Sequence, residues 1–389
     1  MLFNKEIRNM IYLDNAATTF PKPDVVYQTV DYVQRNVAVN IGRGSYKTAA
    51  DAMYIVDETR YLMAELVGID NPNYVVFTPS ATIAANEIIY GFDWNEYKTI
   101  YITPFEHNAV ARPLNFVKQK YGVKIIQLPF NPETQELDIE RTRLMFSKQE
   151  PAYIFLNQIS NVTGAIIPVK EISEMASVYK ATVIVDGSQS VGLLDIDMNR
   201  SGIDYLIFAG HKNLYASWGV GGFICRNNSS ILPFLSGGTG SNSLDLSMGN
   251  EIPISFEPGS PNVIAIASLC ASIKWLKNTS IKIINQRKQE LMDLLVGGLR
   301  KRGCKLYLPK IKENHSSVLS FNIEGYTANE IGTILNQDFD IAVRTGYHCA
   351  PYIHDFLATI GFGGTVRVSV GFFNTTKDIE ALLNAVDDL

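Results

Sequence analysis

Two residues that could do chemistry together stand at the ends of apolar runs. Asp186 closes the run TVIVD, and Lys212 follows the run YLIFA in the turn AGHK. Burial alone disfavours a charged carboxylate, so Asp186 needs a partner. An acid and a lysine at successive strand ends suit pyridoxal phosphate (PLP): the lysine forms a Schiff base with the aldehyde and the acid pairs with the ring nitrogen. The alternative is a buried structural ion pair.

Further polar residues stand at the ends of other runs. His107 in FEHNAV follows TIYIT and could lie flat against a ring or be an ordinary histidine that lines a pocket. Ser80 and Thr82 in PSATIAAN stand at an expected helix start, where hydroxyls and free N–H groups can cradle a phosphate or simply cap the helix. Asn161 in SNVTG and Gln189 in DGSQ could bond a ring hydroxyl or tie down a turn.

The elements that must position these residues form a regular series. Seven short runs alternate with helical patterns, and most are apolar on both faces: YVVFT, TIYIT, VKIIQL, AYIFLN, TVIVD, YLIFA and GGFIC. This pattern is typical of a parallel sheet covered by helices on each side. We therefore predict an α/β fold with a mostly parallel seven-stranded sheet. Ligands of such sheets bind at the carboxyl ends of the strands, where the residues above lie.

The chain changes character after the Gly/Ser segment LSGGTGSNS. The stretch from Asn262 to Gly303 predicts one or two long helices, and short strands and helices follow. The last helix begins with a capping pattern, Thr375 and Asp378. We predict a large domain over residues 13–261, and a smaller α+β domain formed by residues 1–12 and 262–389.

Composition excludes several classes of protein. The chain has 389 residues, 46% of them hydrophobic, and a net charge of −5 without a basic stripe, so we expect no nucleic-acid partner. We also expect no secretion signal, no membrane span and a cytoplasmic location, because no stretch reaches the necessary apolar length. The four cysteines lack C-x-x-C spacing, so neither a metal site nor a disulfide framework is indicated.

A set of motifs extends over almost the whole chain. IYLDNAATTFPKP, SNVTG, VDGSQSVG, FAGHKNLY, EPGSPN, VRTGYHCAP and VRVSVGFFNT occur in this order from near residue 11 to near residue 376. Together they resemble the cysteine desulfurase and selenocysteine lyase branch of the class V aminotransferase family. The resemblance implies a PLP-dependent transferase of fold type I, usually a homodimer with active sites at the subunit interface.

The resemblance also implies roles for single residues. Lys212 would be the Schiff-base lysine, with Asp186 on the pyridine nitrogen, Gln189 on the ring oxygen and His107 stacked on the ring. The other cofactor positions are Ala81, Thr82, Asn161, His211 and Ser260, the last reaching the neighbouring subunit's phosphate. The substrate positions are Asn161, Arg344 and Arg367, and Arg367 would grip the amino acid carboxylate as a fork.

Some positions depart from the family pattern. Ala209 precedes GHK where serine is common, which removes one hydroxyl for the phosphate, and Ile83 replaces an acid. Ser260 stands for a usual threonine, and Ser217 and Trp218 fill a turn that is often Pro-Gln. None of these positions belongs to the covalent chemistry.

Cys349 in VRTGYHCAP is the residue that would select the reaction. Its neighbours Arg344 and His348 are groups that can favour a thiolate, whereas free cysteines such as Cys225, Cys270 and Cys304 are usually buried and inert. The resemblance implies that Cys349 takes sulfur from cysteine as a persulfide, releases alanine and passes the sulfur to an acceptor protein or thiol.

Three other hypotheses remain at this point. The first is a selenocysteine lyase or another carbon–sulfur lyase of the same family. The second, from a different class, is a catalytically silent protein of this fold that serves as a sulfur-carrier scaffold. The third is a cysteine hydrolase using Cys349 and His348, which would leave the residues at the strand ends unexplained.

Overall fold

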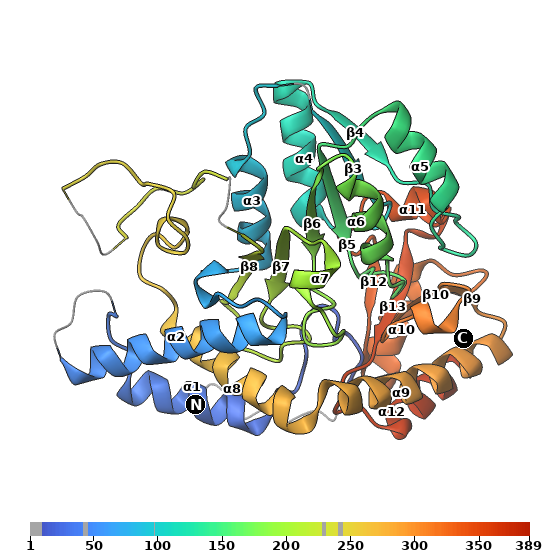
Figure 1. Cartoon of the computed structure of the whole chain (residues 1–389). Helices are drawn as coiled ribbons and strands as arrows, with labels where there is room; N and C mark the ends of the chain where they lie inside the picture. Colours follow the sequence, from blue (N-terminus) through green and yellow to red (C-terminus); the bar gives the residue numbers. More distant parts are fainter. Residues whose placement is uncertain (1–9, 42–45, 97, 228–230, 240–243) are drawn as a thin grey trace.

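A seven-stranded sheet forms the centre of the molecule (Figure 1). The computed structural model describes residues 10–41, 46–96, 98–227, 231–239 and 244–389. The strands are β2 (Val75–Thr78), β3 (Thr99–Ile102), β4 (Lys124–Gln127), β5 (Tyr153–Asn157), β6 (Thr182–Asp186), β7 (Tyr205–Ala209) and β8 (Gly221–Cys225). Each predicted run therefore forms a strand, and the prediction of a seven-stranded sheet is confirmed.

The strand order explains why the polar residues at the strand ends can meet. The order is β2-β8-β7-β6-β5-β3-β4. Strands β4, β3, β5, β6 and β7 run parallel to one another, whereas β8 is antiparallel to both of its neighbours, β2 and β7. The carboxyl ends of β3, β5, β6 and β7 consequently lie at one edge of the sheet, and the chain leaving each of them carries a predicted site residue.

Both faces of the sheet are buried. In β5, Ile154 and Leu156 belong to one apolar cluster, while Phe155 between them belongs to another. Helices α3 (Ala81–Gly91) and α4 (Asn108–Tyr121) contribute to the second cluster, and α6 (Val169–Ser177) and α8 (Val263–Thr279) to the first. Burial on two sides is the reason that these strands read as continuous apolar runs.

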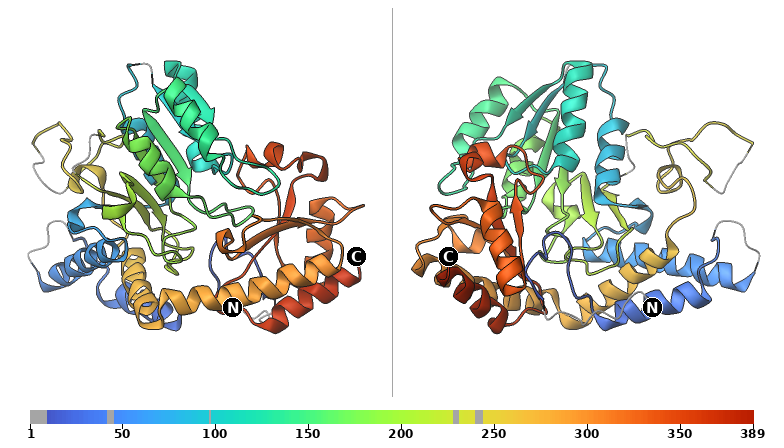
Figure 2. Two further views of the ribbon diagram at one scale, coloured as in Figure 1. Left: turned by 45° about the vertical axis from the view of Figure 1, so that its right-hand side comes forward. Right: turned by 180° about the vertical axis from the view of Figure 1, so that it is seen from behind.

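A second, smaller sheet lies beside the first (Figure 2). It is antiparallel, with the order β12-β13-β10-β9. Its strands are β9 (Lys305–Tyr307), β10 (Val318–Asn322), β12 (Arg344–Gly346) and β13 (Thr365–Ser369), and the helices that share its core are α9 (Ile281–Lys301), α10 (Ala328–Phe339) and α12 (Thr376–Asp387). The capping box predicted for Thr375 and Asp378 is confirmed at the start of α12.

The long helical stretch after residue 262 forms two helices. It breaks at Ser280, whose φ of 74° ends α8 before α9 begins. Helix α8 packs against α1 (Asp24–Asn36) and α2 (Lys47–Leu66) as well as under the large sheet. The predicted domain boundary near residue 262 stays a prediction.

The remaining elements are a two-stranded sheet and short helices. Strand β1 (Ile11–Tyr12) pairs in parallel with β11 (Ile341–Ala342). The α-helices not yet named are α5 (Ile139–Lys148), α7 (Met198–Ser201) and α11 (Ile353–Phe356). Residues 240–243 of the predicted Gly/Ser segment lie outside the described residues. None of the described helices has both the length and the apolar character needed to cross a bilayer.

Candidate active site

Lys212 lies in a turn that is hydrogen-bonded to Thr18 and Thr19 of the amino-terminal segment. The turn begins after β7 ends at Ala209. The hydroxyl of Thr18 donates to the carbonyl oxygen of His211 over 3.0 Å, and that of Thr19 donates to the carbonyl oxygen of Lys212 over 2.9 Å. These two hydrogen bonds come from residues 193 positions earlier in the sequence, and they fix the backbone on both sides of the Lys212 Cα.

The environment prepares Lys212 as an amine. Burial lowers its pKa from 10.5 to about 8; the charge of Asp186 acts in the opposite direction, and those of Arg367 and Arg344 add to the lowering. At a pKa near 8, about a tenth of the side chain is the neutral, nucleophilic amine at pH 7. The same causes indicate that Lys212, Asp186 and the two arginines lie within electrostatic reach of one another.

Asp186 and Gln189 are both buried at the end of β6. One oxygen of Asp186, Oδ1, accepts the backbone N–H of Ser188 over 2.9 Å. Gln189 donates through Nε2 to the carbonyl oxygen of Ala16 over 2.8 Å. The two side chains are thus held at fixed positions beside the Lys212 turn.

A buried lysine supports this arrangement from α9. Lys288 is 2% exposed, and its Nζ donates to Asn213 Oδ1 over 2.7 Å. Asn213, the residue after Lys212, donates through Nδ2 to the carbonyl oxygen of Gln189 over 2.6 Å. Burial lowers the pKa of Lys288 to about 7. Helix α9 is therefore connected to Lys212 and Gln189 through one asparagine.

His107 is held as a neutral ring. It is the N-cap of α4, where its Nδ1 accepts the backbone N–H of Ala109 over 3.1 Å. Burial, followed by the charge of Lys212, lowers its pKa to about 4. The proton of the neutral ring must then be on Nε2, because Nδ1 is an acceptor. A neutral aromatic ring fixed at Nδ1 suits stacking on a flat cofactor.

The expected phosphate cradle combines several of the predicted residues. Ser80 caps α3, with Oγ accepting the N–H of Ile83 over 3.3 Å, so its hydroxyl serves the helix. Thr82 in the first turn is exposed and Ala81 partly buried. Gly221 allows β8 to approach this turn, because a Cβ there would lie 2.7 Å from the Ala81 nitrogen. The absence of a side chain at Gly221 leaves the Ala81 N–H uncovered, and Thr82 is exposed, so an anion can reach the amino end of α3.

His211 has a buried ring nitrogen that no described residue bonds. Its ring stacks on Trp218 with centroids 3.9 Å apart, and burial lowers its pKa to about 3. Its Nδ1 is buried without a partner among the described residues. Trp218, a departure from the family pattern, thus has a packing role, and Ser217 is bonded through its N–H to Ser268 Oγ over 2.9 Å.

Ser260 lies apart from these groups on the surface. It is exposed and lines a hollow of about 680 Å³ together with Asn40, whose Nδ2 lies 3.5 Å from Ser260 Oγ. Exposure of this position agrees with a residue that acts on a neighbouring subunit, and its role stays a prediction.

Cys349 occupies a short, tightly held loop between β12 and α11. His348 and Cys349 have φ angles of 49° and 56°, in the left-handed region that costs an L-residue about 1–2 kcal/mol. Three hydrogen bonds hold them there: the N–H of Asn108 to Cys349 O over 2.7 Å, Asn161 Nδ2 to His348 O over 2.8 Å, and the N–H of Ala350 to Tyr347 O over 3.0 Å. Strain held by surrounding contacts is common where a side chain is presented for chemistry.

Arg344 contacts the cysteine sulfur directly. Its Nη2 lies 3.2 Å from Cys349 Sγ, and Cys349 is partly exposed whereas Cys225, Cys270 and Cys304 are buried. The expectation that His348 also favours the thiolate is wrong. The His348 Nε2 is turned to Thr365, 3.0 Å from its carbonyl oxygen, and burial holds the pKa of His348 well below 6.5, so the ring is neutral. The direction of the ring also argues against a Cys349–His348 hydrolytic pair, because His348 Nε2 is bonded to Thr365 and no hydrogen bond joins the ring to Cys349 Sγ among the described residues.

Arg367 lies fully buried in β13, directly across from Arg344 of β12. Its Nη1 donates to the carbonyl oxygen of Asn161 over 3.0 Å, and its Nη2 is paired with Asp14 Oδ1. Asn161 therefore connects Arg367 to the cysteine loop, while its own Oδ1 is buried without a partner among the described residues. The Arg367 side chain is 1% exposed and that of Asp14 is 20% exposed, so the arginine is buried while its partner is only partly so.

Sequence reasoning missed five residues around the site. Asp14, Thr18 and Thr19 lie in the motif IYLDNAATTFPKP, which carried the resemblance but no residue roles. Asn213 and Lys288 had no signal beyond a polar residue after Lys212 and a lysine in an amphipathic helix.

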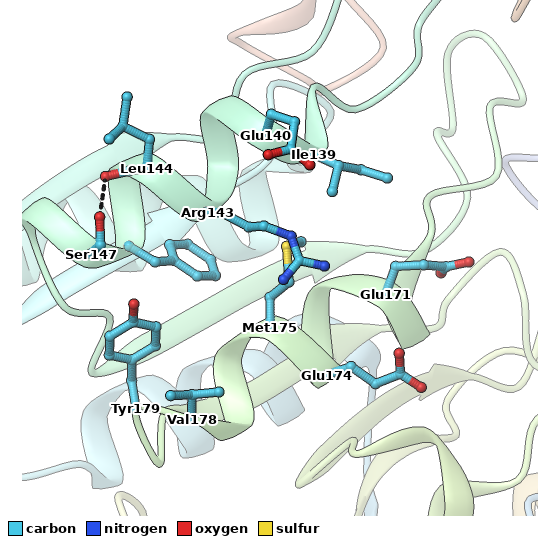
Figure 3. A pocket seen from close by; sticks show the side chains of 11 residues that line it. Ile139, Glu140, Arg143, Leu144, Ser147, Glu171, Glu174, Met175, Val178 and Tyr179 are labelled. Carbon is cyan, nitrogen blue, oxygen red and sulfur yellow. Dashed lines mark hydrogen bonds between the residues drawn. The ribbon is translucent and has the colours of Figure 1, made fainter.

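The groove drawn in Figure 3 is not part of this site. It has a volume of about 600 Å³ between α5 and α6 and is lined by Arg143, Glu171 and Met175, among others, but by none of the predicted site residues. Among the described residues, no group of three or more His, Cys, Asp or Glu side chains is placed to hold a metal ion.

The fold is that of PLP-dependent enzymes of fold type I, as comparison with solved structures shows. A cysteine desulfurase from Thermococcus onnurineus NA1 superposes with a TM-score of 0.90 at 27% identity, covering 97% of this chain and 94% of that one. The cysteine desulfurase CsdA from Escherichia coli gives 0.85 at 28% identity, with the same coverage.

Sequence comparison gives the family. A family model described as Aminotransferase class-V matches residues 11–382. A probable cysteine desulfurase from Xylella fastidiosa is 30% identical over 97% of this chain and 90% of its own length, and one from Synechocystis is 29% identical over 99% and 92%. The chain belongs to the class-V aminotransferase family, in its cysteine desulfurase branch.

Proposed function

We propose that this protein is a PLP-dependent cysteine desulfurase that converts L-cysteine to L-alanine and leaves the sulfur as a persulfide on Cys349. The observation that carries the proposal is the contact between Arg344 and Cys349 Sγ in a hydrogen-bonded loop beside Lys212 and His107. A cation bonded to sulfur favours the nucleophilic thiolate. The names of the relatives and of the similar structures support the same activity.

The residues present fit PLP. The open amino end of α3 and the unpartnered Nδ1 of His211 offer donors for a phosphate, and Asn161 Oδ1 is a buried acceptor without a partner among the described residues. The residues that would hold the cofactor are Ala81, Thr82, His107, Asn161, Asp186, Gln189, His211, Lys212 and, at the neighbouring subunit's phosphate, Ser260. When bound, PLP supplies an aldehyde that joins an amine and a ring that accepts electrons.

The chain's own residues would then carry the reaction. Arg367 binds the substrate carboxylate, and Lys212, once free, takes the α-proton and can return it. The Cys349 thiolate attacks the substrate sulfur, a sulfur–sulfur bond forms and the carbon–sulfur bond breaks. The electron pair of the broken carbon–sulfur bond stays with the three-carbon fragment, which takes up a proton and leaves as alanine. A thiol acceptor must afterwards remove the sulfur from Cys349.

Arg344→Gln should slow the alkylation of Cys349. The amide keeps most of the side chain's size but removes the positive charge 3.2 Å from Sγ, which would otherwise stabilise negative charge on the attacking sulfur. We expect iodoacetamide to modify the Cys349 peptide roughly three- to tenfold more slowly at pH 7, measured by mass spectrometry, in a protein that needs no substrate. Arg143→Gln, on the exposed face of α5, serves as the control. An unchanged rate would assign the arginine another role.

We also infer that the protein is a homodimer in the cytoplasm. Large apolar side chains are exposed along α1 and α2, including Tyr32 at 61%, Tyr54 at 65% and Tyr61 at 60%, and Leu246 is 100% exposed. Exposed apolar surface of this kind is typical of a surface that another subunit covers. Sedimentation velocity should therefore give twice the mass of the 43.3 kDa chain; a monomer at micromolar concentration would contradict this.

Product analysis tests the function itself. Incubation with L-cysteine and a reducing thiol should yield alanine and sulfide in equal amounts, and selenocysteine should be compared at the same concentration. A strong preference for selenocysteine would favour a selenocysteine lyase. Colourless protein that takes up no PLP would favour the sulfur-carrier scaffold.

A further inference from the structure

The pairing of Arg367 raises a question about substrate binding. This inference rests on the proposed function, in which Arg367 receives the substrate carboxylate. In the structure, that guanidinium already carries a carboxylate partner, Asp14, from the segment after β1. The substrate must therefore share or take over an arginine that another negative charge occupies.

The Asp14–Arg367 pair is incomplete. Only Nη2 of the arginine meets Asp14, and only through Oδ1, so the planar fork is not used in the two-bond manner that makes such pairs strong. The Arg367 Nε is buried without a partner among the described residues. Arg367 thus keeps donors for a second carboxylate while Asp14 stays attached.

Asp14 is placed where an incoming anion would meet it. Its side chain is 20% exposed, whereas that of Arg367 is 1% exposed. Its backbone is anchored beside β13 by a bridge to Ser369, with the N–H of Ser369 donating to Leu13 O over 2.8 Å and that of Asn15 donating to Ser369 O over 3.3 Å. Asp14 therefore cannot easily move away from the arginine.

The Asp14 carboxylate offsets part of the positive charge that Arg344 and Arg367 bring to the site. Arg344 and Arg367 are cross-strand neighbours, and both act on Lys212. Asp186 and Asp14 are the carboxylates that act on Lys212 and on Arg367, respectively. Without the charge of Asp14, the arginines would attract any small anion.

We propose that Asp14 is a specificity-determining residue, an internal competitor that weakens the hold of Arg367 on simple carboxylates. An α-amino acid gains a second attachment through its amine, so it binds in spite of the competing charge. A carboxylate without that amine has only Arg367 and is rejected.

The test is the binding of 3-mercaptopropionate, which is cysteine without its amino group, to the cofactor-loaded enzyme. Asp14→Asn keeps an oxygen acceptor for Arg367 Nη2 and removes only the charge. We expect the Asp14→Asn variant to bind 3-mercaptopropionate more tightly than the wild type, with a dissociation constant roughly tenfold lower by calorimetry. Its KM for cysteine should fall by a smaller factor.

A role in positioning Arg367 alone would have the opposite sign: Asp14→Asn would then bind the probe more weakly, and that result, or an unchanged constant, overturns the proposal. Asp387→Asn, which removes the carboxylate from a distant Arg302–Asp387 pair, is the matched control. If Asp14→Asn does not fold, Asp14→Ser makes the same comparison. Calorimetry needs no turnover, so its outcome is separate from whether the protein releases sulfur from cysteine.

Discussion

Lys212→Ala should lose turnover of any amino acid substrate, by roughly a thousandfold or more in kcat/KM, because the variant has neither the amine that attaches the cofactor nor the base that moves the α-proton. The variant should still fold, since the bonds that hold the turn run to the backbone oxygens of His211 and Lys212. Steady-state kinetics with cysteine measures the loss, and the visible spectrum reports whether the attached cofactor is gone.

Attachment at Lys212 can be mapped directly in the unaltered protein. Borohydride reduction should fix PLP to the peptide that contains Lys212. Lys288 is the matched internal control, because it is also buried and its pKa is lowered even further, to about 7, but its Nζ is bonded to Asn213. Label on Lys288, or on any other lysine, would refute the assignment.

The large sheet was predictable because burial on two faces leaves a simple pattern. A strand such as β5, with Leu156 facing one cluster and Phe155 the other, reads as an apolar run whatever its neighbours are. The site residues at the ends of the parallel strands were predictable for a related reason. Parallel strands bring their carboxyl ends to one edge, so Asp186 and Lys212 meet without any knowledge of the side-chain contacts.

Contacts between distant segments were not predictable in this way. The pair between Asp14 and Arg367 joins residues 353 positions apart, and only the bridge of the first segment to β13 brings them together. The connection of Lys288 to Asn213 depends likewise on how α9 packs. No local pattern carries such information, because it is set by the packing of elements and not by their periodicity.

Closeness in sequence was misleading at the cysteine loop. His348 is adjacent to Cys349, yet its ring is directed to Thr365, while Arg344, five residues away, meets the sulfur. The left-handed backbone at both loop residues sends adjacent side chains to different sides. The motif VRTGYHCAP therefore contains both groups expected to favour the thiolate, but only the structure tells which of them contacts it.

Cys349→Ala should separate substrate activation from sulfur release. The loop should keep its shape, because the bonds that hold it run to backbone oxygens and to Asn161, and alanine accepts the left-handed conformation about as well as cysteine. Stability should change by less than about 1 kcal/mol, since the side chain is partly exposed. The variant should stay yellow and still change colour when cysteine is added.

What the variant should lose is the sulfur transfer itself. Without a thiolate, nothing attacks the substrate sulfur, so we expect sulfide release from cysteine to fall by roughly a hundredfold or more. Selenocysteine cleavage should suffer less, because selenium can leave without a nucleophile. Cys304→Ala is the matched control: that thiol is buried, burial raises its pKa, and its loss should leave sulfide release unchanged.

The persulfide gives an independent readout of the same assignment. Wild-type protein incubated with cysteine, without reductant, should gain the mass of one sulfur atom on the peptide that holds Cys349, and the mass should return to its original value when a thiol is added. Arg344 at 3.2 Å would remain beside the attacking sulfur throughout this step, which suits a thiolate more than a neutral thiol. Sulfide release from Cys349→Ala at the wild-type rate would mean that Cys349 is not the acceptor. The activity would then be that of a lyase that eliminates sulfide directly, with Lys212 and Arg367 in unchanged roles.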